Sequence, residues 1–252
     1  MWTTFDPGLD WFSEVLPEGM PVGETTVVSG PGGSGKPLVG FGVVSAWLEA
    51  GGSVVFLLTN AGREFVAETM VQLYDFDVDA YEELSFVEFD PEMDATVDAI
   101  EQDASGTLRA NLLDPPVWET AIDRASDELA GEGPGTLVFG TALNLFLFSD
   151  TYRDRALEAF LDTIEREDDR TYLFTVSTSA FAEDIARVES AADTVLVTAM
   201  DDQRLTLRGV DAASVPITTE FVQVPFSPEQ IATIKSVSEQ TRTSLIPTLK
   251  AI

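Results

Sequence analysis

The chain has 252 residues, of which 44% are apolar and 10% aromatic, so it can bury one well-packed α/β core, whereas two full domains would be cramped. It has 44 Asp and Glu against 14 Lys and Arg, a formal net charge of −30, and it contains no cysteine and no histidine. The sequence therefore excludes disulfides, thiol catalysis, Ser-His-Asp triads and the usual Cys and His zinc sites.

The acidic residues are spread along the chain rather than gathered in a tail, which favours adaptation to salt over an ordinary acidic protein. At about 1 M salt the Debye length falls to about 3 Å, and the self-repulsion is screened. We interpret this charge as that of a protein adapted to a salt-saturated cytoplasm, as in halophilic archaea. No basic residue precedes Lys36, so the start does not resemble a signal peptide, and the longest apolar run, Leu137 to Phe148, is shorter than the about 20 residues that span a bilayer.

The first predicted strand, Thr25 to Ser29, is β-branched and leads directly into a glycine-rich loop. An apolar helix is predicted from Leu38 to Ala50, ended by two glycines. The continuous apolar run from Val54 to Leu58 indicates a strand buried on both faces, and Arg63 to Tyr74 is predicted as an amphipathic helix. Further strands are predicted at Leu84 to Phe89, Thr136 to Phe139, Tyr172 to Val176 and Thr194 to Thr198, and further helices at Val117 to Leu129 and Asp154 to Glu165.

This alternation of strands and helices predicts an α/β fold of three layers, with a mostly parallel central sheet and helices on both faces. After Thr198 only strand signals remain, at Arg204 to Arg208 and Thr218 to Val224. These segments predict antiparallel strands that extend one edge of the sheet.

Residues 226–252 form a tail distinct from residues 1–225. The tail has three basic and two acidic residues and is therefore +1, whereas residues 1–225 are −31. Its helix begins at Ser227, with Pro228 at the first helical position and Gln230 three residues after the cap. A thin apolar stripe leaves two interpretations: the tail packs on its own domain, or it is a docking helix for acidic partners, including other copies of the chain. We prefer the second.

The glycine-rich loop matches the phosphate-binding pattern G-x-x-x-x-G-K-[ST] except at its last position. In that pattern backbone N–H groups hold the phosphates, the lysine reaches the β and γ phosphates, and the hydroxyl binds Mg²⁺. The last residue here is Pro37, which has neither a hydroxyl nor an N–H. The predicted anion-binding residues of the loop are Gly30, Pro31, Gly32, Gly33, Ser34, Gly35, Lys36 and Pro37.

Motifs around this loop resemble the KaiC branch of the RecA-like ATPases. Gly8-Leu9-Asp10 and Gly19-Met20-Pro21-Val22-Gly23 match the opening of the family, and Ala192-Asp193-Thr194-Val195 resembles its A-D-x-V strand entry. Arg204 to Gly209 resembles the strand that presents the family's subunit-bridging Lys-x-Arg-Gly motif. The resemblance implies a RecA-like P-loop domain over residues 1–225.

The same resemblance shows which chemical groups are replaced. The family's water-activating glutamates fall on Asn60 and Ala61, and its Walker B aspartate, which orders Mg²⁺, falls on Gly140. The lysine that reaches a neighbour's γ-phosphate falls on Thr206, although Arg208 is kept. Because phosphoryl transfer depends on positioning and electrostatics, these losses together predict a pseudo-ATPase with no catalytic residues and no metal.

Several alternatives stay open at this point. The loop either binds ATP or ADP without magnesium or is empty, its glycines being kept for a tight turn; Lys36 is the only lysine before Lys235, which favours a retained anion contact. The preferred function is a regulatory or scaffold protein that associates with itself or with an active relative. A live ATPase or kinase with a relocated metal site is the alternative, and a DNA partner ranks lowest because the body has no evident basic track.

Overall fold

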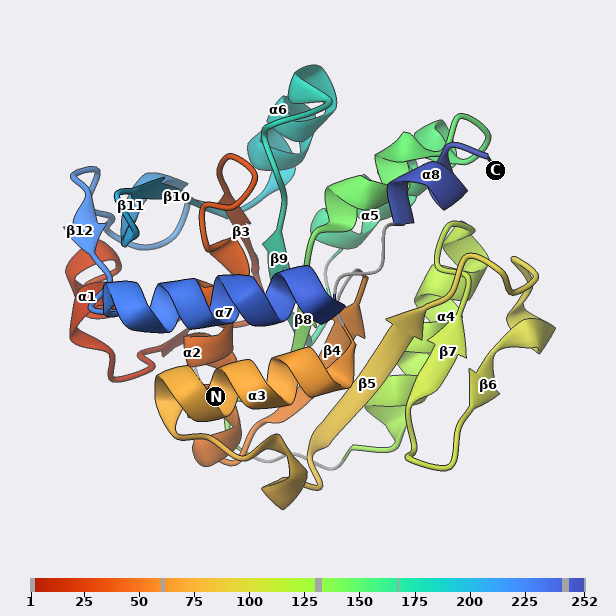
Figure 1. Ribbon diagram of the computed structural model, residues 1–252, viewed down its shortest axis with the longest axis horizontal. Helices are drawn as coiled ribbons and strands as arrows, with labels where there is room; N and C mark the ends of the chain where they lie inside the picture. The colour runs from red at the N-terminus through yellow and green to blue at the C-terminus, as the bar shows by residue number, and fades with distance from the viewer. Residues whose placement is uncertain (1–2, 60–61, 130–132, 167, 242–244, 252) are drawn as a thin grey trace.

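The computed structural model describes residues 3–59, 62–129, 133–166, 168–241 and 245–251. Within these residues one large twisted sheet has helices on both faces, which gives the three layers that the sequence predicts (Figure 1). In sheet order its ten described strands are β12 (Val222–Gln223), β11 (Arg204–Ala212), β10 (Thr194–Asp201), β3 (Thr25–Ser29), β9 (Thr171–Thr175), β8 (Thr136–Gly140), β4 (Ser53–Leu58), β5 (Leu84–Phe89), β7 (Leu108–Ala110) and β6 (Glu101–Gln102).

The centre of the sheet is parallel from β10 to β7. At one edge β10, β11 and β12 pair antiparallel, which confirms the predicted edge. The opposite edge also ends in an antiparallel strand, β6, which the sequence did not predict. Since β9 lies between β3 and β8, the carboxyl ends of these three strands meet at one edge of the sheet.

Successive side chains of the buried strands point to opposite faces of the sheet, so each face has its own hydrophobic core. In β4, Val54 and Phe56 point to one face, and Val55 and Leu57 point to the other. The first face is covered by α1 (Asp10–Val15), α2 (Lys36–Glu49), α3 (Arg63–Tyr74) and α7 (Pro228–Thr241). The second is covered by α4 (Pro115–Asp127), α5 (Arg153–Ile164), α6 (Ala182–Ala191), α8 (Leu245–Leu249) and the 3₁₀ helix η3 (Leu143–Phe148).

Smaller elements complete the described chain. A separate two-stranded antiparallel sheet pairs β1 (Thr4–Phe5) with β2 (Met20–Pro21), on either side of α1. Single 3₁₀ turns form η1 (Val78–Ala80) and η2 (Val97–Ala99). Within the described ranges, no helix is both long and apolar enough to cross a bilayer.

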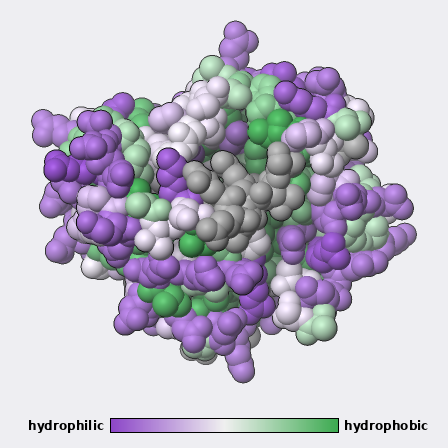
Figure 2. Space-filling view, in the orientation of Figure 1, coloured by the Kyte–Doolittle hydropathy of each residue, from purple (hydrophilic) through white to green (hydrophobic). Residues whose placement is uncertain are grey.

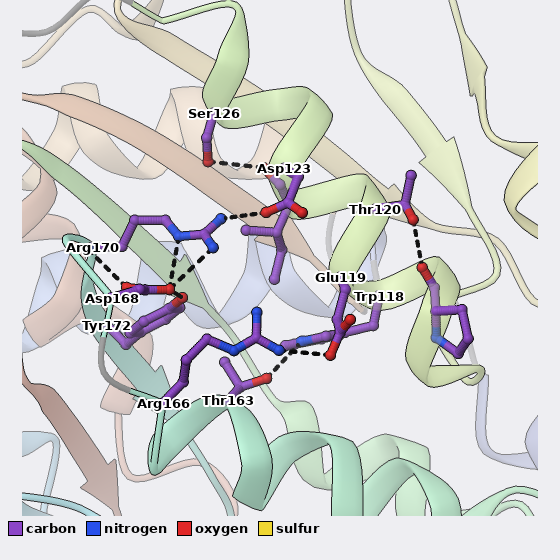
Figure 3. Close-up of polar contacts among 12 residues, drawn as sticks. Trp118, Glu119, Thr120, Asp123, Ser126, Thr163, Arg166, Asp168, Arg170 and Tyr172 are labelled. Atoms are coloured by element: carbon purple, nitrogen blue, oxygen red, sulfur yellow. Dashed lines mark hydrogen bonds and ion pairs between the residues drawn. The ribbon is translucent and has the colours of Figure 1, made fainter.

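Polar contacts join the loop before β9 to the helix α4 (Figure 3). The Arg170 guanidinium donates to Asp123 of α4 at 2.8 Å and to Asp168 on its own loop at 3.1 Å. The Tyr172 hydroxyl donates to Asp168 at 2.6 Å, and burial together with this bond raises the Tyr172 pKa. The network ties residues 168–172 to α4, so it is a structural feature of the fold.

The tail packs on the domain rather than extending from it. Ser227 and Gln230 form the predicted capping box: the Ser227 N–H donates to Gln230 Oε1 at 2.9 Å, and the Gln230 N–H donates to Ser227 Oγ at 3.2 Å. Ile231 and Ile234 of α7 are buried in the core shared with α3, beside which α7 lies (Figure 1). The apolar stripe of α7 is therefore used within the chain, and docking of the tail on an acidic partner stays a prediction that would have to use its other side chains.

Candidate functional site

The glycine-rich loop lies at the carboxyl edge of the sheet, between β3 and α2. Gly33 and Gly35 have φ of 77° and 73°, and Gly35 caps a helix whose first residues are Lys36 and Pro37. Gly30 has φ of 149°, and a Cβ there would lie 2.5 Å from the Thr198 carbonyl oxygen. The backbone of the loop thus requires glycine whether or not a ligand is bound.

Lys36 is buried within this loop, with 6% of its surface exposed. Its Nζ donates to the carbonyl oxygens of Gly30 at 3.0 Å and Pro31 at 2.7 Å, and to Ser34 Oγ at 3.3 Å. Burial lowers the Lys36 pKa to about 8. All three of these partners are neutral, so the ammonium group has no carboxylate partner among the described residues.

Neighbouring strand ends hold the loop in place. The Gly32 N–H donates to Ser179 Oγ at 2.7 Å, and the Thr178 N–H donates to the Gly30 carbonyl at 3.0 Å, both from the segment after β9. Ser34 Oγ lies 2.8 Å from Thr198 Oγ1 of β10. Sequence reasoning missed these partners, although a run of hydroxyl residues directly after a strand was a usable signal.

The remaining donors of the loop suit a phosphate group. The backbone N–H groups of Gly33, Gly35 and Lys36 donate to no acceptor in the described part of the chain. Successive free N–H groups at a helix N-terminus form an anion-binding concavity. The residues present therefore fit a phosphate, which could also draw the Lys36 ammonium away from the loop carbonyls.

The positions expected to hold magnesium do not fit the ion. Pro37 offers no ligand atom, and Gly140 ends β8 in an apolar environment. A Cβ at Gly140 would lie 2.9 Å from Phe174 Cδ1 and 3.1 Å from Leu143 Cδ1, so the space of an aspartate side chain is filled. Among the described residues no group of three or more acidic side chains is arranged to hold a metal.

Asn60 and Ala61, the expected replacements of the water-activating pair, lie outside the described residues. The preceding residue, Thr59, is buried, and its hydroxyl donates to the Thr141 carbonyl. This bond joins the carboxyl ends of β4 and β8 with neutral groups.

Thr206 and Arg208 lie on β11, at the antiparallel edge of the sheet. The Thr206 hydroxyl donates to the Ala199 carbonyl at 3.3 Å, within the β10–β11 pair. The Arg208 guanidinium lies over the Phe221 ring, 5.2 Å from its centre. The structure thus gives Arg208 an aromatic partner in its own chain, and its role toward a bound phosphate stays a prediction about a neighbouring subunit.

Among the described residues, two of the cavities lie away from the loop. One of about 10 Å³ lies beneath η3 and is lined mostly by apolar side chains and by Asn144. The other is an open groove of about 450 Å³ between α5 and α6, lined by residues such as Glu165, Glu183 and Arg187. Neither is lined by a residue of the loop.

Comparison with known proteins identifies the fold but not a family. No model of a protein family matches the sequence, and no curated protein matches it. Among solved structures, the chain is similar to a KaiC-like protein from the hyperthermophilic archaeon Pyrococcus horikoshii OT3, with a TM-score of 0.65 and 15% identity over 89% of this chain and 95% of that one. The sheet order, the edge strands and the loop after β3 therefore belong to a KaiC-like, RecA-type α/β fold.

Proposed function

We propose that the chain is a catalytically degenerate KaiC-like protein that acts as a regulatory or scaffold module. The observation that supports this most strongly is Gly140, whose side-chain space is filled by Phe174 and Leu143 at the strand end where a metal-ordering aspartate would stand. Restoring the carboxylate alone would not restore the site, because two apolar side chains would have to move. Pro37 removes the other expected ligand.

The loop, in this proposal, holds ATP or ADP weakly and without magnesium. The support is the fit described above: free N–H groups beside a buried ammonium group that lacks a carboxylate partner. An anion would supply the missing counter-charge.

Calorimetric titration with ATP and ADP, with and without Mg²⁺ in molar KCl, tests this. We expect weak binding whose affinity is the same with and without Mg²⁺ and which is lost in Lys36→Met. Binding that is strengthened tenfold or more by Mg²⁺ would contradict the proposal and favour an active ATPase with a metal site elsewhere.

We also propose that the module assembles with copies of itself or with an active KaiC-like relative, in the cytoplasm of a halophilic archaeon. The outer edge of the sheet supports an interface, because Phe221, which lies against the Arg208 guanidinium, is 51% exposed, and Val210 of the edge strand β11 is 45% exposed. An acidic partner of the tail would use its exposed side, where Lys235 lies. Sedimentation in molar KCl tests whether this edge is an interface. Phe221→Ser should lower the mass of the assembly, and a mass equal to that of the parent chain would exclude this surface.

A further inference from the structure

The tail contributes one helix to each face of the sheet, α7 to the first and α8 to the second. The Gln230 side-chain amide donates to the Gln72 carbonyl at 3.2 Å, and Phe226 packs on Tyr74 with ring centres 5.8 Å apart. The start of α7 therefore lies at the end of α3, and α7 runs back toward the end of α3 that follows β4. Beyond it, α8 packs against η3, which follows β8.

The short helix α8 depends on η3 for its position. Leu249 is fully buried, Leu245 is 9% exposed, and the Lys250 Nζ lies 5.7 Å from the centre of the Phe148 ring. Ile246, on the other side of the helix, is 38% exposed. A five-residue helix that contains a proline is not stable alone, so contacts with η3 keep it folded.

The 3₁₀ helix η3 begins in a strained backbone conformation, and most of its side chains are buried. It begins after Ala142, which has a φ of 54° although it is not glycine. A cavity of about 10 Å³, room for about one water molecule at most, lies among its buried side chains, so the packing beneath η3 is incomplete. What packs on the outer side of η3 therefore helps to decide its conformation.

A hydrogen-bonded chain leads from η3 to the phosphate loop. Asn144 of η3, 6% exposed, accepts the Ser177 N–H at 2.9 Å. Ser177 Oγ accepts the Ser179 N–H at 3.4 Å, and Ser179 Oγ accepts the Gly32 N–H at 2.7 Å. Thr178, between the two serines, donates its N–H to the Gly30 carbonyl at 3.0 Å.

We propose that α8, by docking on η3, sets the conformation of the phosphate loop through Asn144 and the segment Ser177–Ser179. The tail is then a built-in regulator: a partner that removes α8 from η3 loosens the loop. This inference rests on the proposed function in one respect, namely that the phosphate loop is the site that is regulated. The link itself is a property of the chain without any ligand.

Hydrogen exchange of the full chain in molar KCl tests this link. Leu249→Asp should release α8 and raise exchange at residues 30–36 and 175–180 by about tenfold, whereas Ile246→Asp, on the exposed side, should leave it unchanged. Asn144→Ala should raise loop exchange by a similar factor. Because both changes act on one link, the double variant should exchange no faster at the loop than Asn144→Ala alone.

Two results would overturn the inference: faster exchange in Leu249→Asp that stays within residues 143–149 and 245–251, or fully additive effects in the double variant. Circular dichroism at the same salt checks that each variant is folded. Calorimetry with ATP on the same variants separates this inference from the proposed function. If no variant binds ATP but exchange at the loop still depends on the tail, the proposed nucleotide binding fails while the link between α8 and the loop stands.

Discussion

At the scale of single residues, the site combines one buried cation with neutral partners. In a chain with 44 acidic residues, the described groups that bond to the loop are the hydroxyls of Ser179 and Thr198, the Thr178 amide and the Lys36 ammonium. A phosphate can be held by such groups, but they include no carboxylate that would order a metal or take a proton from water. Lys36 and Gly140 are the residues at which this reasoning can be tested.

Gly140→Asp should destabilise the fold rather than create a magnesium site. The new Cβ would overlap Phe174 and Leu143, and the carboxylate would be buried without a partner, so we expect a loss of about 3 to 5 kcal/mol in the free energy of unfolding. Denaturant unfolding in molar KCl measures it. Gly62→Asp is the matched control, because its Cβ meets nothing within 4 Å and Asp suits the start of α3. A stable Gly140→Asp protein that binds Mg²⁺ would refute this prediction.

Lys36 should make stability depend on pH above neutrality. Its folded pKa is lowered from 10.5 to about 8, so below pH 8 both states carry the proton and burial of the charge costs its full amount. Between about pH 8 and 10.5 the unfolded state binds more protons, and the free energy of unfolding should therefore rise with pH, by up to about 3 kcal/mol. We expect this rise to vanish in Lys36→Met. Equal pH profiles for the two proteins would show that the amine is not desolvated.

At the scale of elements, the sequence predicted the parts whose pattern is strong. The strands β3 and β5 and the helix α3 have the predicted bounds, because continuous apolar runs and a regular amphipathic period mark them. The helix α6 was missed, since only Ile185 and Val188 are buried and no capping side chain marks its start. The predicted strand Thr218 to Val224 is reduced to Val222–Gln223, although the Gly209 N–H still donates to Thr218.

The candidate site was predictable only as far as local motifs reach. The glycine loop and the strand ending at Gly140 follow directly from the sequence, because a tight turn and a buried strand each have a local signal. The contacts of Ser179 and Thr198 with the loop depend on sheet order, which brings together residues about 150 positions apart. The position of the tail was decided by tertiary packing of a weak apolar stripe.

The helix α7 should behave as part of the core. Ile234 is 5% exposed against α3, so Ile234→Ala should lower the free energy of unfolding by about 2 to 4 kcal/mol within a single cooperative transition. Lys235→Ala, at an exposed neighbouring position, should change it by less than about 0.5 kcal/mol. An Ile234→Ala protein as stable as the parent would mean that the tail is not folded against α3 in solution.

At the scale of the whole molecule, the net charge of −30 sets the response to salt, and hydrophilic side chains cover much of the face shown in Figure 2. Added salt weakens exposed ion pairs such as Arg63–Asp79 at 2.5 Å and Arg166–Glu119 at 2.6 Å, but pairs of this kind contribute little. Repulsion among the unpaired carboxylates is the larger effect. We therefore expect the thermal midpoint to rise by roughly 10 °C or more between 0.1 and 2 M KCl. A midpoint that falls over this range would contradict adaptation to salt.

The molecule as a whole has a RecA-type α/β frame, in which we propose that the phosphate loop has lost the metal ligands and the base of an active ATPase. Hydrolysis is the direct test of that proposal. Purified protein should be mixed with ATP and Mg²⁺ in molar KCl, beside Lys36→Ala, and phosphate release followed over many hours. We predict the same low rate for both proteins. Release by the parent chain that is well above the rate of Lys36→Ala would contradict the central claim.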